Sequence, residues 1–217
     1  MASLLSSLIA ALLLVNLIVL GSSRIGTVVR AVALQGVLLG VLAVAAHGAA
    51  HGETSARVVW LAIVSAGLKG WLIPTILFRA LRQVAIKREV EPSLGLLPSL
   101  LLGALATVLA VAAAGRLPLA EAELAPLLVP ASLATVAAGF IVITTRRKAI
   151  SQVLGFLMLE NGIFVFGLLL VEAMPFLVEA GILLDLFVGI FVLSIIIHHI
   201  NREFSSLDTR RLSLLKE

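Results

Sequence analysis

The 217-residue chain contains no cysteine. This absence excludes disulfide bonds, cysteine-ligated zinc, iron–sulfur clusters and a thiol nucleophile within the chain, so any redox chemistry must belong to a partner. Charged residues make up 13% of the sequence and hydrophobic residues 61%, whereas soluble domains have about 25% and 45–50%. Too little polar chain is left for a soluble catalytic or nucleotide-binding domain. We therefore expect no catalytic centre, no metal and no cofactor on this chain.

The hydrophobic residues gather into seven continuous runs of about 18–25 residues, each long enough to cross the hydrocarbon core of a bilayer as a helix. Barrel strands would instead alternate in polarity over about ten residues. The sequence predicts an all-α transmembrane bundle of about seven helices. The runs are Leu4–Gly21, Ile25–Ala46, Val58–Leu81, Leu94–Ala114, Leu124–Thr144, Ala149–Val171 and Phe176–Ile200.

A single membrane domain is expected over residues 1–217, with a four-helix front at 1–115, a three-helix part at 123–200 and a cytoplasmic tail at 201–217. The first run has no basic segment before it and no small-residue cleavage pattern after it. We therefore interpret it as a retained helix and not as a signal peptide.

Lysine and arginine are concentrated in alternate loops. The second and fourth loops hold only Arg57 and Arg116. By the positive-inside rule the loops rich in lysine and arginine face the cytoplasm. This places the N-terminus outside and the C-terminus inside a cytoplasmic membrane. Clusters at helix ends are topology signals, so the formal net charge of +4 does not indicate a nucleic-acid partner. The basic loops and the C-terminal tail hold Arg24, Arg30, Arg79, Arg82, Lys87, Arg88, Arg146, Arg147, Lys148, Arg202, Arg210, Arg211 and Lys216.

Three ionisable residues lie well inside the apolar runs: Lys69, Glu160 and Asp185. Each costs about 2.5–3.5 kcal/mol at the centre of a bilayer before it is paired, so such residues usually mark ion or substrate paths. Pro74 lacks an amide proton and obstructs the carbonyl four residues back, which predicts a helix kink just after Lys69. We expect Lys69 and Glu160 to exchange or steer protons. The alternative for Lys69 is an ordinary buried ion pair with Glu160 or Asp185, and the alternative for Glu160 is a structural hydrogen bond to another helix.

Histidines occur at two other places. His198 and His199 end the last run, where they either exchange protons with the cytoplasm or simply lie among lipid headgroups. His47 and His51 have the spacing of a metal pair, but two ligands in a short outer loop are a weak signal. We expect no metal there.

Amides and glycines inside the runs predict helix contacts. Asn16, Gln35 and Gln152 are expected to form hydrogen bonds between helices. Gly36 and Gly40 form a G-x-x-x-G notch that another helix is expected to fill.

The chain resembles component E of the hydrogenase-4 and formate hydrogenlyase type of membrane complex. The resemblance covers the whole chain, and its most specific parts are TRRKAISQVLGFLMLENGIF at Thr145–Phe164 and LKGWLIPTIL at Leu68–Leu77. The last three runs are also similar to the K subunit of complex I, with Glu160 at its first buried glutamate. Asp185 stands at the second acid, where a glutamate is usual.

The resemblance implies a membrane subunit packed beside large antiporter-like subunits in the lipid bilayer. A soluble nickel–iron hydrogenase or a related redox module would supply the energy. The proton path would run through Glu160, Asp185 and Lys69, with His198 and His199 at its cytoplasmic end. Two rival functions are a scaffold subunit of the same membrane arm and an independent secondary transporter. No sequence repeat supports the transporter.

Overall fold

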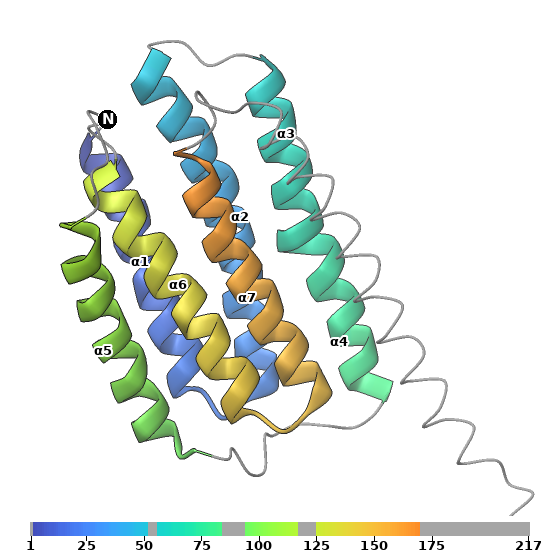
Figure 1. Cartoon of the computed structure of the whole chain (residues 1–217). Helices are drawn as coiled ribbons and strands as arrows, with labels where there is room; N and C mark the ends of the chain where they lie inside the picture. Colours follow the sequence, from blue (N-terminus) through green and yellow to red (C-terminus); the bar gives the residue numbers. More distant parts are fainter. Residues whose placement is uncertain (1, 52–55, 84–93, 117–124, 170–217) are drawn as a thin grey trace, which may run out of the picture.

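The structure is a computed structural model that describes residues 2–51, 56–83, 94–116 and 125–169. All regular secondary structure in these ranges is helical (Figure 1). Continuous apolar runs form helices because the helix satisfies every backbone hydrogen bond within its own segment. The elements are α1 (Ala2–Gly21), α2 (Ile25–His51), α3 (Ala56–Gly67), the π-helical segment η1 (Leu68–Leu72), α4 (Ile73–Gln83), α5 (Leu96–Ala114), α6 (Ala125–Thr145) and α7 (Ala149–Gly167).

The described ranges contain six helical stretches that are long and apolar enough to cross a membrane, and α3, η1 and α4 together make one of them. The first six predicted runs are confirmed, with ends that differ by a few residues. One detail is wrong: α2 continues to His51, so His47 and His51 lie on a helix and not in a loop. The seventh run, Phe176–Ile200, lies outside the described residues.

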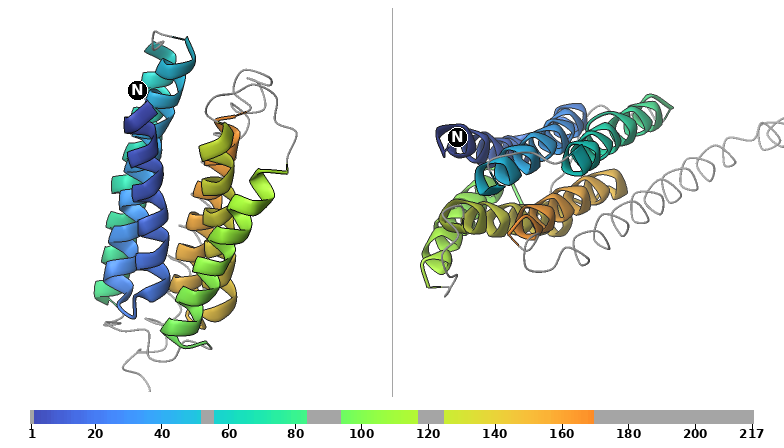
Figure 2. Two further views of the ribbon diagram at one scale, coloured as in Figure 1. Left: turned by 90° about the vertical axis from the view of Figure 1, so that its left-hand side faces the viewer. Right: turned by 90° about the horizontal axis from the view of Figure 1, so that it is seen from above.

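The six stretches form two layers of three (Figure 2). One layer holds α1, α2 and the α3–η1–α4 stretch, and the other holds α5, α6 and α7. Helix α1 packs on α5 and α6, while α2 packs on α7. Successive stretches run in opposite directions, so the turns before α2 and before α7 lie at the same end of the bundle (Figure 1). The first and fifth loops, both basic, are therefore together, as alternate loops of a bundle must be.

The two helices α6 and α7 approach each other through glycine. A Cβ atom on Gly139 would lie 2.6 Å from the backbone nitrogen of Leu159 and 2.8 Å from the carbonyl oxygen of Gly155. Backbone atoms cannot rotate out of the way, so only glycine allows this separation. Small residues that let backbones meet are the usual basis of helix packing in membranes, where lipid is as apolar as leucine.

The apolar core is divided into two clusters along the length of the bundle. One cluster, which includes Val19, Val29 and Val142, lies toward the end with the α1–α2 turn. The other, which includes Leu5 and Leu42, lies toward the opposite end. Where the two clusters meet, α1, α2, α6 and α7 carry buried polar side chains: Asn16, Gln35, Thr135, Glu160 and Asn161. This polar layer lies halfway along the helices and is described next.

Candidate functional site: a buried ion pair and a chain of amides

A buried ion pair joins the two layers of the bundle. The ammonium nitrogen Nζ of Lys69 on η1 lies 3.5 Å from Oε1 of Glu160 on α7, and the two side chains are only 10% and 9% exposed. The same ammonium lies 5.5 Å from the ring centroid of Phe164, one turn along α7, within the range of a cation–π contact. The structure thus realises one of the two pairings expected for Lys69.

The π-helical segment brings Lys69 to this position. Residues Leu68–Leu72 form one π-helical stretch, after which the backbone N–H of Ile73 donates to the carbonyl of Leu68, five residues back. Pro74 follows directly. The sequence predicted an irregularity here in the form of a proline kink; the structure shows widened helical hydrogen bonding before the proline. Such π segments occur frequently at functional sites.

A chain of amide hydrogen bonds crosses the bundle beside the ion pair. The Asn161 side chain donates to Oε1 of Gln35 at 3.4 Å. Gln35 donates to Oδ1 of Asn16 at 2.5 Å, and Asn16 donates to the hydroxyl of Thr135 at 2.9 Å. The hydroxyl of Thr135 donates in turn to the carbonyl of Ala131 at 2.7 Å. Four helices, α7, α2, α1 and α6, are therefore connected through side chains that are nearly fully buried.

The ion pair and the amide chain belong to one polar layer, because Glu160 and Asn161 are consecutive residues of α7. The side-chain oxygen Oδ1 of Asn161 is buried without a hydrogen-bond partner among the described residues. The layer is therefore a continuous band of buried polar side chains in the middle of an otherwise apolar bundle.

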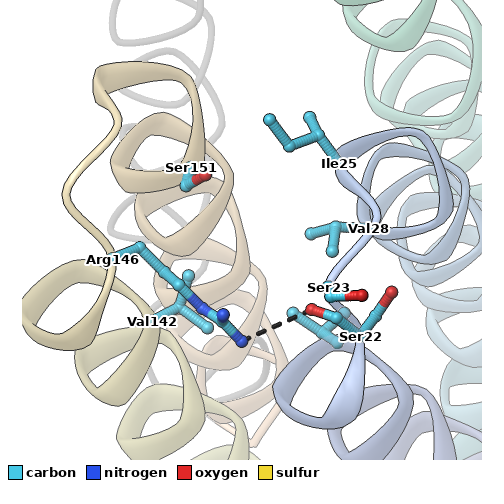
Figure 3. A pocket seen from close by; sticks show the side chains of 8 residues that line it. Ser22, Ser23, Ile25, Val28, Val142, Arg146 and Ser151 are labelled. Carbon is cyan, nitrogen blue, oxygen red and sulfur yellow. Dashed lines mark hydrogen bonds between the residues drawn. The ribbon is translucent and has the colours of Figure 1, made fainter. Parts of the chain in front are cut away.

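A second polar cluster lies at the end of the bundle that carries the basic turns (Figure 3). Arg146, which follows α6, is 5% exposed. Its Nη2 donates to the carbonyl of Leu20 at 3.1 Å and of Ser22 at 3.4 Å. These carbonyls lie at the C-terminal end of α1, where a positive charge is favoured. A small cleft beside Arg146 is lined by Ser22, Ser23 and Ser151, among others.

The other predicted site residues divide into two groups. Asp185, His198 and His199 lie outside the described residues. The prediction for Gln152 is wrong: its side chain is exposed in the first turn of α7 and donates to the carbonyl of Arg146 at 3.3 Å, which is a contact within the turn. The reason is its depth, since it lies at the end of the bundle where water satisfies an amide.

Two members of the polar layer, Thr135 and Asn161, were not predicted from the sequence. A threonine in an apolar helix usually forms a hydrogen bond to the backbone of its own helix. Nothing in the sequence therefore indicates that Thr135 also contacts another helix. Asn161 is noticeable in the sequence only because it follows Glu160. In contrast, the expected roles of Asn16 and Gln35 in bonds between helices are confirmed.

These features define a polytopic helical membrane protein with a charged and amide-rich layer at mid-depth. The chain is 30% identical over 207 residues to the uncharacterized protein Rv0085 of Mycobacterium tuberculosis, and the match covers 95% of this chain and 93% of that protein. The chain belongs to the family of that mycobacterial protein. It matches no family model and no solved structure.

Proposed function

We propose that the chain is a membrane subunit of a hydrogenase- or complex I-like respiratory assembly and contributes buried charges to a proton or sodium path. The observation that carries this proposal is the ion pair between Lys69 and Glu160, 3.5 Å apart and midway between two apolar clusters. Charges at this depth cost about 2.5–3.5 kcal/mol each. A bundle that only fills space gains little from them, whereas an ion path requires them.

The pair provides a simple coupling element. Two unit charges about 4 Å apart attract each other by roughly 4 kcal/mol when the effective dielectric constant is about 20. A proton that binds Glu160 removes this attraction and releases the ammonium of Lys69 to other partners. Loss of the proton restores the pair. The charge state of one residue therefore controls the position of the other, and movement of charge in a neighbouring subunit changes both.

The rest of the path follows from the resemblance to component E. Asp185 continues it in the seventh apolar run, and His198 and His199 exchange protons with the cytoplasm. In this arrangement the N-terminus is outside and the C-terminus inside the cytoplasmic membrane. Large antiporter-like subunits lie beside the chain, and a soluble nickel–iron hydrogenase or related redox module supplies the energy.

A scaffold role is the second candidate, favoured by the amide chain from Asn161 to Thr135. Amides neither gain nor lose protons near neutral pH, so these bonds hold helices together without carrying charge. A scaffold that packs between pumping subunits predicts that neutral substitutes for Lys69 and Glu160 leave ion transport intact.

The test is the Glu160→Gln substitution in the membrane complex. Glutamine has the same size and can still accept a bond from Lys69, so we expect the complex to assemble at normal levels. Redox-driven proton movement into inverted vesicles should fall at least tenfold, while Glu160→Asp, which retains a carboxylate, should keep part of it. Full pumping by Glu160→Gln would contradict the proposal and favour the scaffold.

The partner is tested by purification through a C-terminal tag in mild detergent, followed by mass spectrometry. Antiporter-like subunits together with a hydrogenase-like module are the expected result. A folded chain that purifies alone and transports ions in liposomes would instead identify an independent transporter.

A further inference from the structure

Two consecutive residues of α2, Gln35 and Gly36, contact the two helical segments that carry the buried ion pair. On one side, Gly36 lies against the backbone of η1. A Cβ atom on Gly36 would be 2.6 Å from Cβ and 2.9 Å from the carbonyl carbon of Lys69, and 3.1 Å from the backbone nitrogen of Gly70. The contact is reciprocal, because a Cβ atom on Gly70 would be 2.6 Å from Cγ2 of Val37. Helix α2 thus sets how deeply the Lys69 backbone enters the bundle.

On the other side, Gln35 is bonded to α7. Its Oε1 accepts from the side chain of Asn161 at 3.4 Å, and Asn161 directly follows Glu160 in the chain. Gln35 is 0% exposed, and its own amide nitrogen is held by Asn16. Its side chain has little freedom to follow α7 if that helix moves. The bond therefore fixes the backbone that carries Glu160 relative to α2.

From these contacts we infer that Gln35 and Gly36 are the positioning residues of the Lys69–Glu160 pair: α2 holds both partners, and this dipeptide sets the distance between them. The inference rests on the proposed function for its biological meaning, but the geometry stands by itself. Non-bonded carbon atoms rest at about 3.5–4.0 Å. A methyl group on Gly36 must therefore displace the Lys69 backbone by about 1 Å, and no change of rotamer relieves a contact with a main-chain atom.

The chain offers a matched control one helical turn away. A Cβ atom on Gly40 would be 2.9 Å from Cβ of Ala66 and 3.0 Å from the carbonyl oxygen of Ala62. Gly40→Ala therefore disturbs the same layer of helices by a similar amount, but at α3, before the π segment begins. A general loosening of the bundle should follow from both glycine substitutions, whereas a change in the ion pair should follow only from Gly36→Ala.

The test measures the protonation of Glu160 directly. Dicyclohexylcarbodiimide enters lipid and modifies carboxyl groups in their protonated form, and mass spectrometry of the resulting peptides locates the modified residue. In the intact purified complex at pH 7, Lys69→Met removes the partner charge and gives the highest rate at Glu160. We expect Gly36→Ala to raise the wild-type rate by about tenfold, which corresponds to about 1.4 kcal/mol of lost charge pairing. Gly40→Ala should leave the rate within about twofold of wild type.

Gln35→Met provides a second variant that adds no backbone contact, in case Gly36→Ala does not assemble. It should also raise the rate at Glu160, because methionine fills the volume but does not hold Asn161. The inference is overturned if neither Gly36→Ala nor Gln35→Met changes the rate, or if Gly40→Ala raises it equally. The labelling requires no transport, so its failure is distinct from that of the proposed function, which full pumping by Glu160→Gln would show.

Discussion

Glu160 and Asn161 are consecutive residues of α7 with different chemistry. The carboxylate can bind and release a proton, and it faces an ammonium 3.5 Å away. The amide cannot change its charge near neutral pH, and it bonds to Gln35 on α2. Two adjacent positions thus combine a group that can change state with a group that holds the helix still. This division places a titratable group on a stretch of backbone that an amide hydrogen bond holds to α2.

Arg146 and Arg147 give a prediction at the same scale, because they are neighbours with the same charge. Arg146 is buried and donates to the carbonyls of Leu20 and Ser22, whereas Arg147 is exposed. Arg146→Leu should lower the free energy of unfolding by about 1.5–3 kcal/mol, the usual contribution of a hydrogen bond to a charged group.

The control is Arg147→Leu, which removes the same positive charge from the same turn. It should change the free energy of unfolding by less than about 0.5 kcal/mol. Denaturant titration of the detergent-solubilised protein, followed by circular dichroism, compares the two variants. Equal losses would mean that the charge of the loop matters and that the contact with α1 does not.

The sequence predicted the ionisable members of the site better than their arrangement. Lys69 and Glu160 stood out because a charge in a long apolar run is costly and therefore rare. Which residue faces which is not predictable from the sequence, because helices that are apolar on all sides have no polar face that reveals their rotation. Arg146 shows the same limit: its position in a basic loop predicts only a topology signal, although its side chain is also buried.

At the scale of helices, the contact between α6 and α7 depends on glycine, which leads to a further prediction. Gly139→Ala places a methyl group against the backbone of Leu159 and Gly155, so the helices must separate. Overpacking of this kind costs about 1–3 kcal/mol. The thermal midpoint of the solubilised protein should fall by several degrees.

Gly167→Ala is the matched control, since a Cβ atom on Gly167 would meet nothing within 4 Å among the residues that the structure describes. It lies at the end of α7, and alanine has the higher helix propensity. The thermal midpoint should stay constant or rise slightly. A fall equal to that of Gly139→Ala would show that loss of glycine in itself, and not helix contact, explains the effect.

The helices themselves were predictable from the sequence to within a few residues. Length and continuous hydropathy are sufficient because lipid permits no unsatisfied backbone. The ends were less certain: α2 continues through Gly48 to His51, although glycine and alanine near an interface also occur in loops. The π-helical hydrogen bonding of Leu68–Leu72 was not predictable, because no local sequence pattern distinguishes it from a proline kink.

For the molecule as a whole, the absence of cysteine makes the orientation directly testable. Single cysteines introduced at Ser23, in the α1–α2 turn, and at Gly115, at the end of α5, lie at opposite ends of the bundle. With the basic loops inside, a membrane-impermeant maleimide applied to intact cells should label Gly115→Cys and not Ser23→Cys. Ser23→Cys should react only after permeabilisation.

The cysteine-free parent chain is the blank for this labelling, because every signal must come from the introduced thiol. Lys148→Cys, in the α6–α7 turn, should behave as Ser23→Cys does, since both turns lie at the same end. Labelling of Ser23→Cys in intact cells, with protection of Gly115→Cys, would reverse the proposed orientation.

The π-helical segment also indicates where the length of the chain can differ between members of the family. One π-helical turn within an α-helix holds one extra residue, so Leu68–Leu72 is the place where a gain or loss of a single residue is absorbed locally. Deleting one residue there would restore regular α-helix, and α3 and α4 would keep the faces that they present to the bundle. Trp60, now 67% exposed, would stay exposed. Among relatives, a one-residue gap at this point should therefore leave the pattern of large and small residues along α3 unchanged.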